Sequence, residues 1–288
     1  MISIIIPSRN RLSFIQDLLF DLSQQESLAD EVIVVDQSDE PYQNLSCVHI
    51  IDPNLGPCKA RNLGLTRCSG EIIIFLDDDI RVEKDFIKQM VAPIIEGHTD
   101  VVVGAMLNME RQYRNSSYTF WRHDSRNWLL SLTANPGDPG RHQTLSFTTC
   151  CSAIRRRVYE TIGGFDEYFD PDGAGEDREY GLRIFHAGFT MLYDGQASVR
   201  HYGAPSGGRR ESSSGFKYQN ILEANSVYIV SKYFSWSVFD QFCSDWLKSI
   251  LRRGRGLNPR KWIRSFLWRN EARKHVEDIR AIKQKNSL

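Results

Sequence analysis

Short apolar runs alternate with helical patterns over the first hundred residues of the chain. The runs predict buried strands, because each is followed by polar or turn-forming residues; they lie at 2–6, 32–35, 48–51 and 71–76. Apolar residues at helical spacing predict helices over 12–22, 57–67 and 85–96. Strands and helices in this order predict an α/β fold with a mostly parallel central sheet flanked by helices.

The second half of the chain has weaker periodicity. Its patterns predict helices over 152–162 and 176–187, each ended by glycine, and a short strand over 197–201. A Gly- and Ser-rich stretch at 203–215 precedes further apolar residues at helical spacing. We therefore expect a helical extension over 216–288.

The 288 residues carry no formal net charge, but the two ends of the chain differ. From Lys248 onward there are thirteen Lys or Arg and three acids, whereas the preceding residues contain 23 bases and 33 acids. A basic tail on an acidic body indicates an anionic partner such as lipid headgroups or nucleic acid. Four apolar residues between Trp262 and Leu267 lie among basic ones, as in a helix on a membrane surface. We expect peripheral contact with an anionic membrane through 255–288; a solvated tail or an oligomer contact is the alternative.

Several features predict a cytoplasmic protein. No signal peptide precedes the first strand, and no apolar stretch approaches the ~20 residues that span a bilayer. The six cysteines show no CxxC spacing, so reduced thiols are the simplest interpretation. We expect the protein in the cytoplasm, with its tail at the inner face of the plasma membrane.

Three adjacent carboxylates, Asp77 to Asp79, follow the clearest of the predicted strands. Ser8 and Arg9 follow the first strand and Asp36 the second, and the carboxyl ends of parallel strands meet at one edge of a sheet. Adjacent carboxylates repel one another, and a divalent cation such as Mg²⁺ or Mn²⁺ is the usual remedy. A solvated, acid-rich turn is the alternative.

Four further positions carry candidate chemistry, each with an ordinary structural alternative. Asp36 can accept hydrogen bonds from a base or ribose, or it can end a turn. Arg61, early in a predicted helix, can contact phosphate or base, or lie along the surface. Asp177, beside Glu176, can deprotonate a hydroxyl or can cap its helix. His201 can complete a metal shell at the end of its strand, or it can simply pack.

Six segments, in this order, resemble the family 2 glycosyltransferases, which are inverting enzymes with a GT-A fold. They are SIIIPSRNR, DEVIVVDQSD, NLGPCKARNLGL, GEIIIFLDDD with its Asp-X-Asp motif, GGFDE and GEDREYGLRIFHAGF. The resemblance covers residues 1–205. It implies a catalytic GT-A domain over 1–215, with a donor half at 1–105 and an acceptor half at 106–215. The extension at 216–288, basic from 248, follows.

On the nucleobase side, the resemblance implies that Pro7, Arg9 and Asp36 flank the base, with Arg61 nearby. Two positions depart from the family. Arg9 replaces a frequent aromatic residue, and Gln37 stands where an acidic residue, Gly or Ser is common. The choice among uridine, thymidine and guanosine donors therefore stays open.

On the phosphate side, the resemblance implies that Asp77 contacts the ribose and that Asp79 binds the metal bridging the diphosphate. Asp78 is grouped with the donor-binding residues without a task of its own. His201 matches a position that ligates the metal in some members of the family.

The implied reaction moves a sugar from a nucleoside-diphosphate sugar to a hydroxyl of a glycan or a polyprenyl-linked saccharide, with Mn²⁺ or Mg²⁺ as cofactor. Such a reaction belongs to polysaccharide or cell-envelope biosynthesis. Asp177 would be the base that deprotonates the acceptor hydroxyl, and Glu176 would hold the acceptor. As a further hypothesis, Arg209 or Arg210 reaches the diphosphate or an anionic acceptor as its glycine-rich segment closes. A loop without this role is the alternative.

Other classes of protein are weighed against this one. A catalytically inactive nucleotide-sugar-binding module would be expected to lose one of the acidic site residues, all of which are present. A nucleotidyltransferase would need a glycine-rich loop after the first strand, and Pro7 to Arg11 contains no glycine. We expect no nucleic-acid partner, because such a partner would leave the acidic cluster unexplained.

Overall fold

The computed structural model describes residues 1–52, 56–108, 137–171 and 173–208, together with a few positions between 221 and 233. The chain divides into two compact units, residues 1–120 with 131–215, and residues 121–130 with 216–288. The fold below is that of the first unit. Its division into a donor half and an acceptor half stays a prediction, and the basic tail lies outside the described residues. In the described part of the chain, no helix is both long enough and apolar enough to cross a bilayer.

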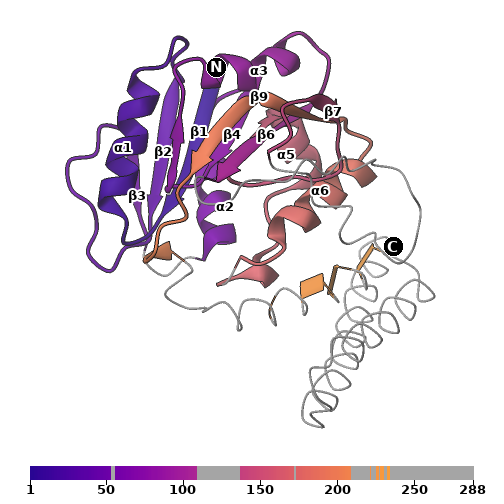
Figure 1. The fold of residues 1–288 in the computed structure, drawn as a ribbon. Coiled ribbons are helices and arrows are strands. Elements are labelled where there is room, and N and C mark those ends of the chain that lie inside the picture. The colour runs from indigo at the N-terminus through magenta and orange to yellow at the C-terminus, as the bar shows by residue number, and fades with distance from the viewer. Residues whose placement is uncertain are drawn as a thin grey trace, which may run out of the picture. The chain divides into compact units, whose positions relative to one another are not determined.

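The described strands form one mixed sheet, in the order β3-β2-β1-β4-β8-β6-β9-β5, with β7 paired to β9 (Figure 1). Their bounds are β1 Ile2–Ser8, β2 Glu31–Asp36, β3 Val48–Ile51, β4 Ile72–Leu76, β5 Ile80–Val82, β6 Val101–Asn108, β7 Arg141–Gln143, β8 Cys151–Arg155 and β9 Met191–His201. Strands β3, β2, β1 and β4 run parallel, whereas β8 is antiparallel to both of its neighbours. The apolar faces of this sheet supply most of the hydrophobic core.

Helices connect and flank the parallel strands (Figure 1). They are α1 Leu12–Ser23, α2 Pro57–Arg67, α3 Phe86–Ile95, α5 Arg156–Ile162 and α6 Glu176–His186, with a 3₁₀ turn η1 at Glu167–Phe169. Helix α2 starts with Pro57, whose fixed backbone angle suits the first turn. Gly64 lets α2 approach β1 closely, because a Cβ there would lie 2.5 Å from Cγ2 of Ile5.

The structure confirms the strands and helices predicted over the first hundred residues. The helix predicted over 152–162 is wrong in its first half, because Cys151–Arg155 forms β8 and α5 begins only at Arg156. Strand β8 lies between β4 and β6 and is buried along nearly its whole length. Burial on both faces removes the alternation of apolar and polar residues that identifies a strand. The strand predicted at 197–201 is the end of the longer β9, and β6 was not predicted.

This topology brings the predicted polar residues to one edge of the sheet. Ser8 and Asp36 are paired in register at the carboxyl ends of β1 and β2. Strand β4 is parallel to β1 and ends directly before Asp77. The pairing of β5 with β9 sets Ile80 opposite His201. His201 therefore lies close to the aspartates although it is distant from them in the sequence.

Candidate active site

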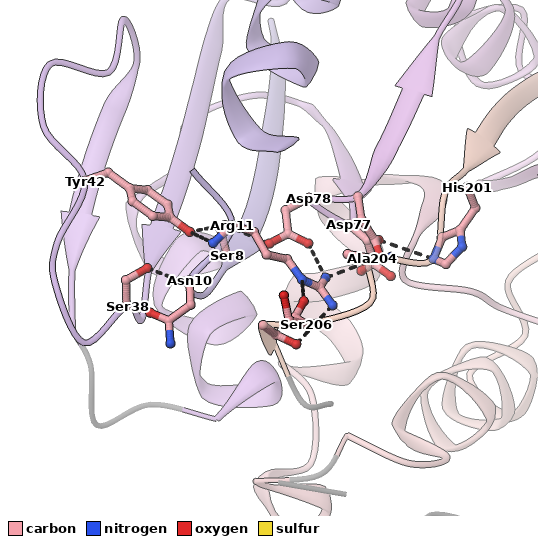
Figure 2. A network of polar contacts seen from close by, with 12 residues as sticks. Ser8, Asn10, Arg11, Ser38, Tyr42, Asp77, Asp78, His201, Ala204 and Ser206 are labelled. Carbon is pink, nitrogen blue, oxygen red and sulfur yellow. Dashed lines mark hydrogen bonds and ion pairs between the residues drawn. The ribbon is translucent and has the colours of Figure 1, made fainter. Parts of the chain in front are cut away.

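The three aspartates after β4 point into three different environments. Asp77 is half-buried, and its Oδ1 accepts a hydrogen bond from Nη2 of Arg61 at 2.9 Å. Asp78 is buried and accepts hydrogen bonds from Ser8 Oγ and Arg11 Nη1, both at 2.7 Å. Asp79 is buried and faces His201. Figure 2 shows Asp78 turned toward Ser8 and Arg11, away from His201.

Asp77, Asp79 and His201 can act together as ligands for a metal ion. One candidate ligand atom from each lies within 4.8 Å of the other two. Nε2 of His201 lies 3.3 Å from Oδ1 of Asp79. Two carboxylate oxygens and an imidazole nitrogen form a donor set that suits a divalent cation. The residues present therefore fit the metal that the sequence predicted, and Asp78 is outside the ligand group.

The two buried aspartates differ in their affinity for protons. Burial raises the pKa of Asp78 to about 6; the charge of Arg11 opposes this shift, and the charge of Asp79 adds to it. Burial also acts to raise the pKa of Asp79, but the hydrogen bond and charge of His201, with help from Arg11, outweigh it. The pKa of Asp79 is thereby held well below its ordinary value. Asp79 is ionised at neutral pH, as a metal ligand must be.

Arg61 connects Asp77, in the candidate metal group, to the start of helix α6. Its side chain is buried; Nη2 donates to Asp77, and Nη1 lies 3.6 Å from Oε1 of Glu176. Its guanidinium also lies over the Phe165 ring, 5.7 Å from the centroid. Nε and Nη1 of Arg61 are buried without a hydrogen-bond partner among the described residues, which leaves donors for a ligand. The resemblance implied a place for Arg61 near the nucleobase; in the structure its charged partners are Asp77 and Glu176.

Asp177 and Glu176 open helix α6 behind Gly175, whose φ of +98° favours glycine. Glu176 is buried against Arg61, whereas Asp177 is half-exposed and accepts a hydrogen bond from the Arg178 amide at 2.7 Å. Burial, and then the charges of Asp77, Asp177 and Asp79, raise the pKa of the Cys150 thiol well above its ordinary value. The thiol itself stays protonated and is not a nucleophile.

Asp36 and Arg9, two of the residues predicted on the nucleobase side, contact the loop between β2 and β3. Asp36 is buried; the amides of Ser38 and Tyr42 donate to its carboxylate at 2.9 and 2.7 Å, and His49 Nε2 lies 3.1 Å from it. These contacts show Asp36 shaping the loop, and its role at the base stays a prediction. Arg9 lies 3.4 Å from Asp39 in an exposed ion pair.

Pro7 is part of β1, in register with Val35.

The start of helix α2 is occupied by a side chain from elsewhere in the chain, because Asp170 accepts hydrogen bonds from the amides of Cys58 and Lys59 at 2.9 and 3.1 Å. A phosphate at these two amides would have to displace Asp170. Arg209 and Arg210 lie outside the described residues.

Sequence reasoning missed Arg11 and Tyr42, which together with Ser8 hold Asp78 and the first loop in place. Tyr42 Oη accepts a hydrogen bond from the Arg11 amide at 2.7 Å and lies 2.9 Å from Ser8 Oγ. The only signal for Arg11 is its place in the Pro-Ser-Arg-Asn-Arg segment after β1.

The fold is that of the GT-A glycosyltransferases. The crystal structure of GalNAc-T7 with UDP, GalNAc and Mn²⁺ matches with a TM-score of 0.60 at 17% identity, over 84% of this chain and 49% of that one. S. aureus TarS 1-349 in complex with UDP-GlcNAc matches with a TM-score of 0.54 at 18% identity, over 85% of this chain and 79% of that one. The fold class predicted from the sequence is confirmed.

The chain belongs to glycosyl transferase family 2, whose sequence model matches residues 3–163. The pre-mycofactocin glycosyltransferase of Mycobacterium tuberculosis is 24% identical over 211 residues, 69% of this chain. The O-antigen chain rhamnosyltransferase RfbN of Salmonella typhimurium is 24% identical over 213 residues, 69% of this chain and 66% of its own length. The chain spans 42% of the first of these relatives and 17% of the O-antigen biosynthesis protein RfbC of Myxococcus xanthus.

Proposed function

We propose that this protein is a metal-dependent, inverting glycosyltransferase that moves a sugar from a nucleoside-diphosphate sugar to a hydroxyl of a glycan or lipid-linked saccharide. The observation that carries the proposal is the group of Asp77, Asp79 and His201 at the carboxyl edge of the sheet. Membership of family 2 supports the reaction class. Relatives named for O-antigen chains and for poly(ribitol-phosphate) support a glycan or cell-envelope acceptor.

The metal group supports a nucleoside diphosphate as the leaving group. A divalent cation held by Asp77, Asp79 and His201 would neutralise charge on the departing diphosphate. The imidazole favours a first-row ion such as Mn²⁺ over Mg²⁺, which prefers oxygen ligands. One structural relative is consistent with this choice, because the GalNAc-T7 crystal structure contains UDP and Mn²⁺. A TarS crystal structure, a complex with UDP-GlcNAc, is consistent with a nucleoside-diphosphate sugar as the donor. Asp77 and the free Nε of Arg61 are available to orient the donor.

Asp177 is the better placed of the two acids to remove the proton from the acceptor hydroxyl. Glu176 is buried and paired with Arg61, so its charge is already compensated. Asp177 is half-exposed at the start of α6, where an incoming hydroxyl can reach it. One base is sufficient for direct displacement, which inverts the configuration at the anomeric carbon. Glu176, held by Arg61, is left to position the acceptor.

The proposal is tested with a panel of UDP-, dTDP- and GDP-sugars, with and without Mn²⁺. Thermal stabilisation by one nucleotide class, dependent on Mn²⁺ and accompanied by slow donor hydrolysis, is expected. Stabilisation by none of the nucleotides would contradict the proposal. Stabilisation without hydrolysis or transfer, equal in the wild type and Asp177→Asn, would favour an inactive nucleotide-sugar-binding module instead.

Contact of residues 255–288 with an anionic membrane at the cytoplasmic face is a separate part of the proposal, supported by the basic and apolar pattern of the tail. Flotation with vesicles of phosphatidylglycerol at low salt tests it. Binding that is lost when the chain is truncated after residue 254 is expected. Failure of the full chain to float would refute the membrane contact and leave the transferase proposal intact.

A further inference from the structure

Arg11 has no role in the site predicted from the sequence, yet its guanidinium lies at the centre of the polar network in Figure 2. It is the N-cap residue of α1, and its side chain is 10% exposed. Nη1 donates to Oδ1 of Asp78 at 2.7 Å. Nε and Nη2 donate to the carbonyl oxygens of Ser206 and Gly207 at 3.0 and 3.1 Å. Each guanidinium nitrogen is engaged, and its partners come from two distant parts of the chain.

The segment that follows His201, residues 202–208, is held between the aspartates and the loop after β1. The amides of Tyr202 and Ala204 donate to the carbonyl oxygen and Oδ2 of Asp79 at 3.0 and 2.9 Å. The Gly208 amide donates to the carbonyl oxygen of Arg9 at 2.9 Å. Arg11 is the side chain that binds both sides at once, through Asp78 and through the segment's carbonyls.

Gly207 allows the segment to approach Arg11. Its φ is +73°, and a Cβ there would lie 2.7 Å from Cγ of Arg11 and 2.8 Å from the carbonyl oxygen of Arg9. Any side chain at this position would push the backbone away from the arginine. The planar fork of arginine can reach a carboxylate and two carbonyls together, which the single ammonium of lysine cannot.

These contacts determine the orientation of the Asp79 carboxylate, and so which of its oxygens faces the metal position. Its Oδ2 receives the Ala204 amide and lies 3.4 Å from Nη1 of Arg11. Its Oδ1 is thereby directed at Nε2 of His201, 3.3 Å away. If segment 202–208 moved away from Arg11, Oδ2 of Asp79 would lose its partner and the carboxylate would be free to turn.

We propose that Arg11 is a positioning residue of the metal group: it holds segment 202–208 against Asp78 and Asp79 and so fixes Asp79 and His201 in a ligating arrangement. The inference rests on the proposed function, because it assumes that Asp77, Asp79 and His201 bind a divalent cation. In this proposal Arg11 acts through Asp78, Asp79 and the segment, and not by contact with the metal or the substrate.

The direction in which Arg11→Gln changes the Mn²⁺ affinity distinguishes a positioning role of Arg11 from a purely electrostatic one. Removing a positive charge beside Asp78 and Asp79 should by Coulomb attraction alone tighten the binding of a cation. If Arg11 positions the ligands, Arg11→Gln instead weakens Mn²⁺ binding, by about tenfold or more, as expected for loss of a residue that orients metal ligands. Titration of the protein with Mn²⁺ alone, followed by the electron paramagnetic resonance signal of the free ion, measures this affinity.

Two further variants distinguish a loss of positioning from a general loss of folding. Gly207→Ala keeps the charge of Arg11 but separates it from the segment, and it too is expected to weaken Mn²⁺ binding. Arg156→Gln is the matched control, because Arg156 also binds two carbonyl oxygens, those of Cys68 and Gly70 at 2.9 and 2.8 Å, away from the aspartates. It is expected to lower stability while leaving Mn²⁺ affinity unchanged.

Each outcome bears on a different proposal. Weaker binding in Arg11→Gln and Gly207→Ala, with the control unaffected, supports positioning by Arg11. Wild-type affinity or tighter binding in folded Arg11→Gln would overturn it while leaving the metal group in place. Failure of the wild type to bind Mn²⁺ would overturn the metal group itself, and the role of Arg11 with it.

Discussion

Nη2 of Arg61 donates to Oδ1 of Asp77 at 2.9 Å, and this ion pair joins helix α2 to the three aspartates that follow β4. The arginine side chain is 5% exposed. Burial acts to lower the pKa of Arg61, but the charges of Asp77 and Glu176 outweigh it, so the guanidinium stays charged. One buried charge thus pairs with Asp77 after β4 and with Glu176 at the start of α6.

Loss of this charge is expected to destabilise the protein and to disorder both acids. Arg61→Met removes a buried guanidinium from beside Asp77 and Glu176, and breaking a buried ion pair in this way costs about 3–5 kcal/mol. Urea unfolding followed by circular dichroism measures the change in unfolding free energy. Lys88→Met is the control, since Lys88 pairs with Glu26 at an exposed position outside the site, and such a surface pair contributes little. An Arg61→Met variant as stable as the control would contradict a joining role for Arg61.

Asp177→Asn is expected to remove the base and leave the donor site intact. The transfer rate should fall by about 10²–10⁴-fold, the range for a positioned general base. The backbone amide of Arg178 donates a hydrogen bond to the Asp177 carboxylate. The side-chain amide oxygen of an asparagine can accept the same bond, so the fold should persist. Transfer kinetics and Mn²⁺ binding are measured on the same preparation. An equal loss of both would point to structural damage and would contradict the assignment of the base.

His201→Ala is expected to weaken Mn²⁺ binding by more than about tenfold, because removing a ligand should cost at least as much as removing a residue that orients one. Electron paramagnetic resonance of the free ion reports the affinity. His142→Ala is a suitable control, because His142 stacks on Tyr193 and belongs to the short β7, outside the metal group. Unchanged affinity in His201→Ala would exclude the histidine as a ligand.

Glu31 provides a test of stability against pH away from the site. Burial acts to raise the pKa of Glu31, but hydrogen bonds from Ser3 and Ser69 outweigh it and lower the pKa. A lowered pKa in the folded state means that Glu31 stabilises the protein above its ordinary pKa of about 4.3, and that this contribution is lost as pH falls through the folded value.

Glu31→Gln should therefore lower Tm at pH 7 by about 2–4 °C, the effect of roughly 1 kcal/mol in a domain of this size. The difference from wild type should shrink as the pH is lowered toward about 3, below the ordinary pKa of the carboxyl group. Scanning calorimetry at several pH values measures it. A difference independent of pH would show that the carboxylate charge is not what these hydrogen bonds stabilise.

The sequence predicts those parts of the candidate site whose functional residues are consecutive in the chain. An apolar run followed directly by Asp77 to Asp79 identifies both a buried strand and an acidic edge, because the two features are adjacent. His201 gave no comparable signal; its proximity to Asp79 depends on β5 pairing with β9, across more than a hundred residues. Such long-range pairing is set by tertiary packing, which leaves no local pattern.

The residues that hold the site were less predictable than the ligands. Arg11 has no local signal for its role, because its partners lie 67, 195 and 196 positions further along the chain. Strand β8 has the pattern of a helix start because it is buried on both faces and runs directly into α5. In both cases the environment of the residue, and not its local sequence, decides its role.

Donor hydrolysis with and without Mn²⁺, by the wild type and by Asp79→Asn, is the most direct test of the central claim. Asp79 presents one carboxylate oxygen to His201 and has its pKa held low by that neighbour, so the asparagine variant loses a charged ligand at nearly constant shape. We predict Mn²⁺-dependent release of nucleoside diphosphate by the wild type and its loss in Asp79→Asn. Equal release by both proteins, or release by the wild type that chelation with EDTA does not affect, would contradict a metal-dependent glycosyltransferase.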